Sequence, residues 1–228
     1  MSDVAVITGA SRGIGRATAE ALVRRGFAVA LLGRVHADVA AVAAEIEREG
    51  GRALPVECDV SDAAAVDRAA QTVLRELGAP RVLVNNAGVV ERARVDEMSE
   101  ESWDHVVDVN LKGPFLVSRA FLPAMKRQET GRIIHVSSIS ATLGSAGASA
   151  YCASKWGLVG FMKSLAEELR GTGLQTLAVL PGSVDTRMLH GSGFAAQMTA
   201  EDVASTIVWA ALEAPQAANG SAIEIFGP

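Results

Sequence analysis

The chain has a single tyrosine, and a lysine follows it four residues later in Tyr151-Cys152-Ala153-Ser154-Lys155. Apolar spacing over 150–171 predicts a helix, which places both side chains on one helix face. A free phenol has a pKa of about 10, too high for easy proton exchange at neutral pH, and a neighbouring ammonium lowers it. The pair therefore suits acid–base chemistry, although a surface tyrosine beside a lysine occurs by chance.

A serine is available to assist that tyrosine. Ser138 stands 13 residues before Tyr151, directly after the predicted strand Arg132–Ser137. Ligands of open α/β sheets bind at the carboxyl ends of the strands. Ser138 is therefore placed to donate a hydrogen bond to a substrate oxygen while Tyr151 delivers a proton.

Glycines gather where the first predicted strand ends, in Thr8-Gly9-Ala10-Ser11-Arg12-Gly13-Ile14-Gly15, and a helical pattern begins at once. Glycines allow a tight turn and let the backbone approach a pyrophosphate, which then lies at the positive end of a helix. The spacing G-x3-G-x-G differs from the better-known G-x-G-x-x-G, and any strand-to-helix turn can use glycine. Placed after the first strand, the loop favours dinucleotide binding over a purely structural turn.

Two arginines near this loop favour NADPH over NADH. The second predicted strand ends in Leu32-Gly33-Arg34, where a site selective for NAD has an acidic residue that binds the ribose 2′-hydroxyl. An arginine suits a 2′-phosphate instead, and Arg12 offers a second guanidinium. The alternative is that both are solvated surface side chains.

Apolar runs alternate with amphipathic ones along the whole chain, and seven of the former predict strands. These are Val4–Ile7, Ala28–Leu32, Ala53–Glu57, Val82–Asn85, Arg132–Ser137, Gln175–Leu180 and Ala222–Phe226, with helices near 13–25, 37–49, 62–77, 99–128, 150–171 and 200–213. Strands that are apolar throughout suit a sheet covered on both faces, and the alternation implies parallel strands. We therefore expect one α/β domain over 1–228, a Rossmann fold with a doubly wound seven-stranded parallel sheet.

Local signals refine the helices. Ser61-Asp62 and Thr199 are expected to cap the helices that follow them, and Gly50-Gly51 and Gly78 to end two others. Pro114, preceded by Gly113, falls inside the pattern 99–128 and should bend that helix near Asn110.

Composition excludes several classes of protein. The net charge is −5, the pI is near 5.4, and no basic run supplies a nucleic-acid footprint. The two cysteines and four histidines show no metal-ligand spacing, so no metal site is predicted. The first apolar run, Val4–Ile7, is too short for a secretory or membrane segment, so we expect a cytoplasmic protein without membrane contact.

Taken together, these motifs resemble the short-chain dehydrogenase/reductase family over essentially the whole chain, most of all its 3-oxoacyl-(acyl carrier protein) reductase-like members. The resemblance implies a catalytic tetrad of Asn110, Ser138, Tyr151 and Lys155. It also implies a set of cofactor-binding residues, namely Gly9, Ser11, Arg12, Gly13, Ile14, Gly15, Arg34, Asp59, Val60, Asn86, Ala87, Gly88, Tyr151, Lys155, Pro181, Gly182, Val184 and Thr186.

The resemblance implies a role for each member of the tetrad. Tyr151 would be the general acid in carbonyl reduction, and Ser138 would position the carbonyl. Lys155 would hold the nicotinamide ribose and lower the Tyr151 pKa. A fall of about three units corresponds to roughly 4 kcal/mol, so the positive cofactor ring and burial are expected to contribute. Asn110 would hold a water that links Lys155 to solvent.

The stretch after Pro181-Gly182 is shorter than the family usually has. Ser183–Met198 is expected to form a reduced lid over an open or mobile substrate site. Family layout puts five residues at the substrate cleft, namely Val90, Ser140, Leu143, Met188 and Phe194. The charged Glu91, Arg92 and Arg94 are expected at its rim or as solvated loop charges.

The sequence therefore predicts an NADPH-dependent oxidoreductase that reduces a ketone or aldehyde carbonyl of a small molecule. An NAD-dependent alcohol dehydrogenase and a non-catalytic NADPH-binding regulatory protein are the alternatives. The resemblance implies a homodimer or homotetramer built on the helices near 99–128 and 150–171. Neither the substrate and its stereochemistry nor the physiological direction follows from the sequence.

Overall fold

Strands and helices alternate along residues 2–227, the part of the chain that the computed structural model describes. The strands are β1 (Val4–Thr8), β2 (Ala28–Gly33), β3 (Ala53–Glu57), β4 (Val82–Asn85), β5 (Gly131–Val136), β6 (Leu174–Pro181) and β7 (Ala222–Ile225). The α-helices are α1 (Gly13–Arg24), α2 (His36–Arg48), α3 (Ala63–Glu76), α4 (Glu100–Val107), α5 (Gly113–Met125), α6 (Ser149–Glu168) and α7 (Ala200–Leu212). Each predicted strand and helix is confirmed to within a few residues, except that the pattern over 99–128 forms two α-helices, α4 and α5.

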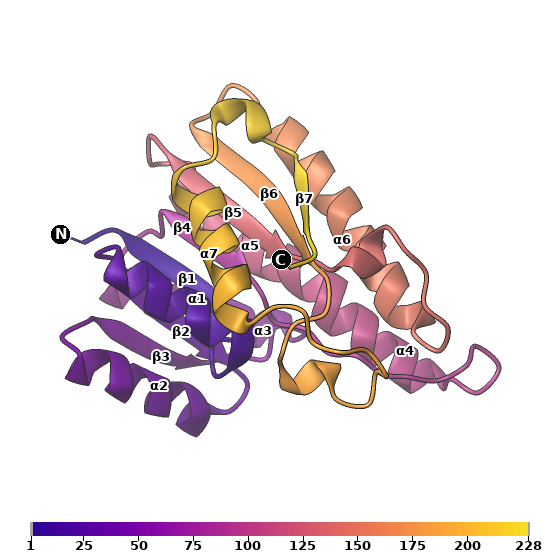
Figure 1. The fold of residues 1–228 in the computed structure, drawn as a ribbon. Coiled ribbons are helices and arrows are strands. Elements are labelled where there is room, and N and C mark those ends of the chain that lie inside the picture. The colour runs from indigo at the N-terminus through magenta and orange to yellow at the C-terminus, as the bar shows by residue number, and fades with distance from the viewer. Residues whose placement is uncertain (1, 228) are drawn as a thin grey trace.

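The strands form one parallel sheet in the order β3-β2-β1-β4-β5-β6-β7 (Figure 1). From β1 the chain proceeds to β2 and β3 on one side of the sheet, then crosses to β4 and continues outward on the other. The order therefore reverses between β1 and β4, and a crevice opens at the carboxyl ends of those two strands.

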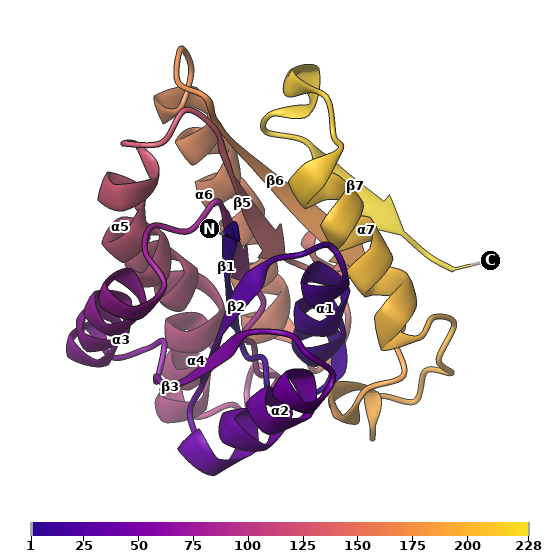
Figure 2. The same ribbon diagram turned by 90° about the vertical axis from the view of Figure 1, so that its left-hand side faces the viewer.

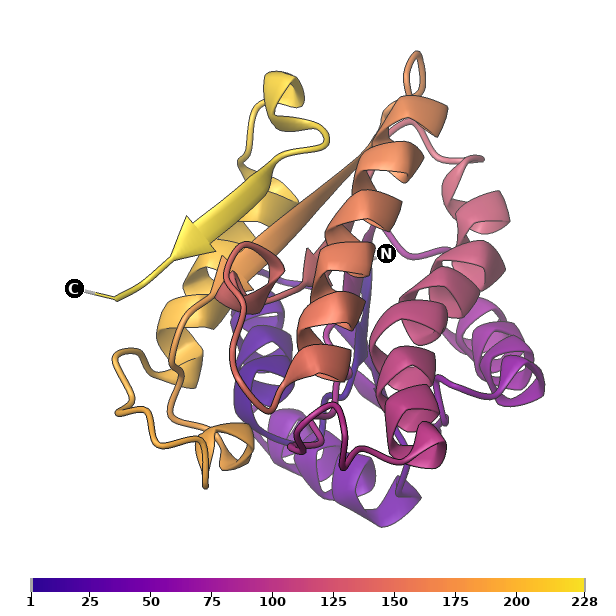
Figure 3. The same ribbon diagram turned by 90° about the vertical axis from the view of Figure 1, so that its right-hand side faces the viewer.

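Helices cover both faces of the sheet, as the strands' apolar character predicts. One core joins the sheet to α1, α2 and α7, and a second joins its other face to α3, α5 and α6. Figure 2 shows these two layers on opposite sides of the sheet, and Figure 3 shows α5 and α6 side by side with β7 at the sheet edge. All residues of β1, β2, β4 and β6 are buried, which explains the lack of alternation in their sequences.

The predicted long helix over 99–128 is interrupted where Pro114 led us to expect a bend. After α4 the segment Asp108–Lys112 forms a π-helical turn, in which the Gly113 amide donates to the Asp108 carbonyl, and α5 then begins. Pro114 has no amide hydrogen to give the carbonyl of Asn110 four residues earlier, so the regular pattern cannot continue there.

The capping signals are confirmed. The Asp62 carboxylate accepts from the Ala64 amide at 2.9 Å, and Thr199 and Asp202 form a reciprocal capping box at the start of α7. Gly50 and Gly78 follow α2 and α3 with φ of +83° and +93°, the left-handed conformation that favours glycine.

Hydrogen bonds join the loops after β1 and β4. The Thr8 hydroxyl accepts from the Asn86 and Ala87 amides, both at 3.0 Å, and the Asn86 side chain donates to the carbonyls of Thr8 (2.9 Å) and Gly9 (3.1 Å). Gly15 packs against this junction: a Cβ there would lie 2.3 Å from the Gly9 oxygen and 2.5 Å from Asn86 Nδ2. Only glycine therefore lets α1 start this close to both strands.

We expect Gly15→Ala to destabilise the fold by about 3 kcal/mol, because the added methyl group meets backbone and a fixed amide. Gly144→Ala is the matched control, since its Cβ would meet nothing within 4 Å, and its effect should stay within about 0.5 kcal/mol. Urea unfolding of the three proteins measures both values. Equal stability of the two variants would contradict this packing constraint.

A buried polar cluster lies between the sheet and α5. The Asn85 amide donates to the Ser118 hydroxyl at 3.1 Å and contacts His135 Nδ1 at 3.3 Å, and the ring centroids of His135 and Phe161 lie 5.6 Å apart in a T-shaped arrangement. Nδ1 therefore accepts, and His135 Nε2 has no hydrogen-bond partner among residues 2–227. Burial, and then the charge of Lys155, lowers the pKa of His135 to about 3, so the ring is neutral in the folded chain.

This histidine makes stability depend on pH. The ordinary pKa of 6.5 applies in the unfolded chain, so between there and about 3 the unfolded state binds the extra proton and stability falls as pH falls. We expect the free energy of unfolding to be about 2 kcal/mol lower at pH 5 than at pH 7 from this group. His135→Asn should remove that difference, whereas replacement of the exposed His190 should not. Identical pH dependence in wild type and His135→Asn would show that His135 is not held neutral.

Candidate active site

A cavity of about 870 Å³ follows the carboxyl ends of the strands. Its walls are the turns after β1, β2, β3, β4, β5 and β6, so it occupies the crevice that the strand order creates. The segment after β6, Ser183–Met198, lies below these strand ends and is drawn in orange in Figure 1. The volume falls within the range of small-molecule and cofactor sites.

Backbone forms the floor of one end of the cavity. Gly9 and Gly13 have φ of +64° and +52°. These positive values allow the tight turn that leads from β1 into the amino end of α1. Arg12 occupies the position before α1 in an extended conformation and offers no side-chain cap, so the first amides of the helix remain available. This is the arrangement that binds phosphate groups.

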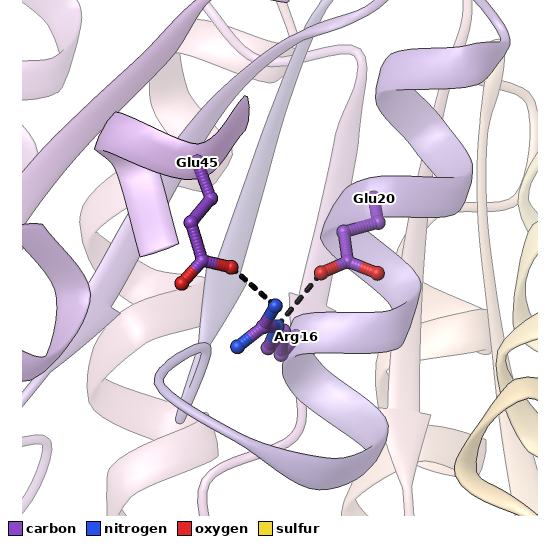
Figure 4. A network of polar contacts seen from close by, with 3 residues as sticks. All are labelled: Arg16, Glu20 and Glu45. Carbon is purple, nitrogen blue, oxygen red and sulfur yellow. Dashed lines mark hydrogen bonds and ion pairs between the residues drawn. The ribbon is translucent and has the colours of Figure 1, made fainter. Parts of the chain in front are cut away.

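Arginines at this end differ in their availability. Arg16, one turn into α1, forms ion pairs with Glu20, at 2.7 Å, and with Glu45 of α2 (Figure 4), so it joins the two helices. Arg12 and Arg34 are exposed, line the cavity and belong to none of the ion pairs within residues 2–227. They are the two guanidinium groups free to meet an anion.

Asp59 lies beyond them, after β3. One of its carboxylate oxygens accepts from the Ser61 amide (2.9 Å) and hydroxyl (2.6 Å). Partial burial raises the pKa of Asp59, but these hydrogen bonds and the charges of Arg34 and His105 outweigh it and hold the pKa below its usual range. The group is thus an ionised acceptor fixed in the cavity wall.

At the other end of the cavity, α6 brings Tyr151 and Lys155 together, as the spacing predicts. The Lys155 ammonium lies 5.6 Å from the Tyr151 ring centre and donates to the Val136 carbonyl at 2.9 Å. It is buried, and burial lowers the pKa of Lys155 to about 8, so the side chain is mostly charged at neutral pH. Ser138, at the end of β5, lines the same wall.

The pKa of the Tyr151 phenol is raised, whereas the sequence analysis expected it to be lowered. Burial raises the pKa of Tyr151 above its usual value and outweighs the opposite influence of Ser138 and of Arg92. The expectation that burial helps to lower this pKa was wrong, because removal of water disfavours the charged phenolate. The neutral phenol is the stable form in the protein alone, which suits a proton donor.

Asn110 belongs to the wall behind the site. It is fully buried in the π-helical turn, where its amide oxygen accepts from the Val89 amide at 2.8 Å. Its amide nitrogen donates to the Val89 carbonyl (2.8 Å) and to Ser154 Oγ (3.1 Å). Asn110 therefore links the loop after β4 to α6 and does not itself line the cavity.

Most of the residues that the sequence analysis assigned to the site line this one cavity. Apart from Gly15 and Asn110, every residue that the sequence analysis placed in catalysis or cofactor binding lines the cavity, and so do Val90, Ser140, Leu143, Met188 and Phe194. Of the three charged residues expected at the rim, only Arg92 lines it. The sequence analysis missed Arg187, whose position directly after Thr186 was the available signal.

The described part of the chain, residues 2–227, contains neither a candidate metal site nor a candidate membrane-spanning helix. No three His, Cys, Asp or Glu side chains gather there in a way that could hold a metal ion. None of the described helices is long and apolar enough to cross a membrane.

Comparison with known proteins agrees with this geometry. The family model described as short chain dehydrogenase matches residues 3–195. A 3-oxoacyl-(acyl-carrier-protein) reductase of Synechocystis sp. is 41% identical over 188 residues, covering 82% of this chain and 76% of the relative. The short-chain reductase protein NovJ of Streptomyces niveus is 44% identical over 186 residues, with coverage of 82% and 71%.

A solved structure extends the similarity to the whole fold. The crystal structure of a 3-ketoacyl-ACP reductase from Sinorhizobium meliloti superimposes with a TM-score of 0.92 at 34% identity, covering 98% of this chain and 97% of that one. The seven-stranded parallel sheet, the crevice at its strand ends and the family match lead to one assignment. The chain belongs to the short-chain dehydrogenase family of oxidoreductases.

Proposed function

We propose that the chain reduces a ketone or aldehyde carbonyl to an alcohol with NADPH, and that Tyr151 donates the proton. One observation carries this proposal. A single cavity is lined at one end by the glycine-rich loop with two unpaired arginines, and at the other by Ser138, Tyr151 and Lys155. A nucleotide cofactor and a carbonyl substrate can therefore meet within one site.

The residues present fit this cofactor. A Cβ at Gly9 would lie 2.9 Å from the Ala87 backbone, so glycine is needed there for the loop to lie against the turn after β4. Arg12 and Arg34 suit the 2′-phosphate, and Asp59 is an acceptor for the adenine amino group. The nicotinamide half would lie along Gly88 and the Pro181-Gly182 segment, against Val184 and Thr186. When bound, NADPH supplies the hydride.

The remaining steps belong to side chains of this chain. Ser138 would hold the carbonyl oxygen by donating a hydrogen bond, and the neutral Tyr151 would transfer its proton to that oxygen. Lys155 would hold the ribose hydroxyls with the N–H groups that the Val136 carbonyl leaves free, and its charge would stabilise the phenolate left behind.

The proton that returns to Tyr151 is proposed to come from solvent, past Asn110 and by way of Lys155. A Cβ on Gly88 would lie 3.3 Å from Asn110 Oδ1 and 3.6 Å from Lys155 Nζ, so the two polar groups converge on one glycine. The Asn110 amide also keeps Val89 and Ser154 in place. Asn110 is thus proposed as a positioning residue.

We further propose that Ser183–Met198 acts as a short lid and that subunits associate through α4, α5 and α6. The lid residues Met188 and Phe194 line the cavity and are partly exposed, at 38% and 65%. Large apolar side chains are also exposed on the three helices, namely Trp103, Phe115 and Trp156. Such exposure is typical of interaction surfaces.

Titration of the purified protein with NADPH and NADH, followed by assays with ketones, 3-oxoacyl thioesters and quinones, tests the function. We expect NADPH to bind more tightly than NADH, with turnover of one substrate class. Tight binding without any turnover would favour the non-catalytic alternative, and tighter NADH binding would favour an NAD-dependent alcohol dehydrogenase.

Tyr151→Phe should reduce turnover below detection while leaving NADPH affinity within a few-fold, because only the proton is lost. Steady-state assays and fluorescence titration measure the two quantities. Retained turnover would remove Tyr151 from the role of proton donor.

Arg34→Asp should shift the preference toward NADH by one to several kcal/mol, about fivefold or more in relative affinity, because a charged hydrogen bond to the phosphate is replaced by repulsion. Arg48→Asp provides the control, since Arg48 is exposed at the end of α2 and does not line the cavity. The ratio of the two dissociation constants is the readout. A ratio that is the same in both variants would show that Arg34 does not meet the 2′-phosphate.

A further inference from the structure

Arg92 lies at the end of the cavity that holds Tyr151. Arg92 lies on the loop after β4, four residues beyond Gly88, and lines the cavity, whereas its charged neighbours Glu91 and Arg94 do not. Arg94 instead forms an ion pair with Asp96 at 3.3 Å. Of the three charged residues on this loop, only Arg92 therefore lines the space in which a substrate would lie.

The backbone beside Arg92 is fixed in the cavity wall. The Ala93 amide donates to the Gly147 carbonyl at 3.0 Å, and Ala93 pairs with Ala148 in an isolated parallel bridge. This attaches the loop after β4 to the turn that leads into α6. Arg92 is thus held next to the helix that carries Tyr151.

The guanidinium of Arg92 reaches the neighbourhood of the phenol. Its Nη2 lies 3.5 Å from the Met188 carbonyl, and the Met188 sulfur lies 4.0 Å from the Tyr151 hydroxyl. The charge of Arg92 also lowers the pKa of Tyr151, although burial outweighs it. Both observations place the positive charge close to the group that would protonate a substrate.

No acidic side chain neutralises this charge. Arg92 belongs to none of the ion pairs formed within residues 2–227. Of the acidic residues that line the cavity, Asp38 and Asp59 lie at the end with Arg34, and Asp185 lies on the lid beside a second arginine, Arg187. The contact with Met188 is at the outer limit of a hydrogen bond, so a carboxylate would readily replace it.

We propose that the substrate is an oxo acid, a ketone that carries a free carboxylate, and that Arg92 binds this carboxylate. The inference rests on the proposed carbonyl reduction and names its substrate class. Arg92 presents a planar pair of N–H donors that matches a carboxylate. The apolar side chains of Val90, Leu143 and Phe194 line the same cavity and suit a short aliphatic chain between carboxylate and ketone. Arg92 is then the residue that determines specificity.

Matched acids and esters test this assignment. Acetoacetate and 4-oxopentanoate are compared with their ethyl esters as substrates with NADPH. We expect wild type to prefer at least one acid over its ester by tenfold or more in kcat/KM. Arg92→Gln should reduce that preference by about ten- to a hundredfold, mainly through KM, and Arg92→Lys should restore part of it. Arg94→Gln, the matched control, should leave activity and preference unchanged.

Binding measured apart from turnover separates failure of this inference from failure of the proposed function. In Tyr151→Phe loaded with NADPH, oxo acid binding is followed through nucleotide fluorescence, and adding Arg92→Gln should weaken it at least tenfold. An unchanged dissociation constant, or a wild-type enzyme that reduces esters as well as acids, would overturn the role of Arg92 alone. Arg92-dependent binding with no turnover in wild type would overturn the reductase proposal instead.

Discussion

The site depends on the junction between the ends of β1 and β4. Neighbouring parallel strands would normally send their chains to the same side of the sheet, but here the chain leaves these two strands in opposite directions. Thr8 and Asn86 close the gap with side-chain hydrogen bonds to backbone, so that the crevice has a rigid floor. Gly15 then allows α1 to begin directly on that floor.

Burial of polar groups controls the chemistry at the far end of the crevice. Burial lowers the pKa of Lys155 to about 8, which leaves it mostly charged at neutral pH, and its charge in turn helps to keep His135 neutral. Tyr151 is stabilised as a neutral phenol for the same reason, the scarcity of water. The protein alone therefore holds a proton on the phenol, and the positive groups needed to release it are arranged around the space left for ligands.

Charge is distributed unevenly along the cavity. Arg12 and Arg34 lie at one end and Arg92 and Arg187 near the other, and none of the four forms an ion pair within residues 2–227. In a chain of net charge −5, these four guanidinium groups give the cavity a local positive field that favours anionic ligands. The proposed dinucleotide would account for the first two arginines, and the proposed oxo acid for Arg92.

Much of the architecture follows from the sequence because its causes are local. Apolar runs of four to eight residues define strands covered on both faces, and Pro114 interrupts a helix wherever it is packed. The spacing of Tyr151 and Lys155 likewise places them on one face of α6 without reference to any other element. The glycine-rich turn was also predictable from the sequence, since glycine readily adopts the positive φ that Gly9 and Gly13 have.

Only the tertiary structure decided which charges face the cavity and how the reacting groups are solvated. Nothing in Glu91-Arg92-Ala93-Arg94 distinguishes the two arginines, because the distinction comes from tertiary contacts. Ala93 bonds to Gly147 before α6, Arg92 contacts Met188 on the lid, and Arg94 pairs with Asp96 on the loop itself. The direction of the Tyr151 pKa also escaped sequence reasoning, since spacing reveals a neighbouring cation but not the removal of water around the phenol. Local pattern thus determined the elements and the identity of the proposed catalytic side chains, whereas burial and long-range contact decided their electrostatic state.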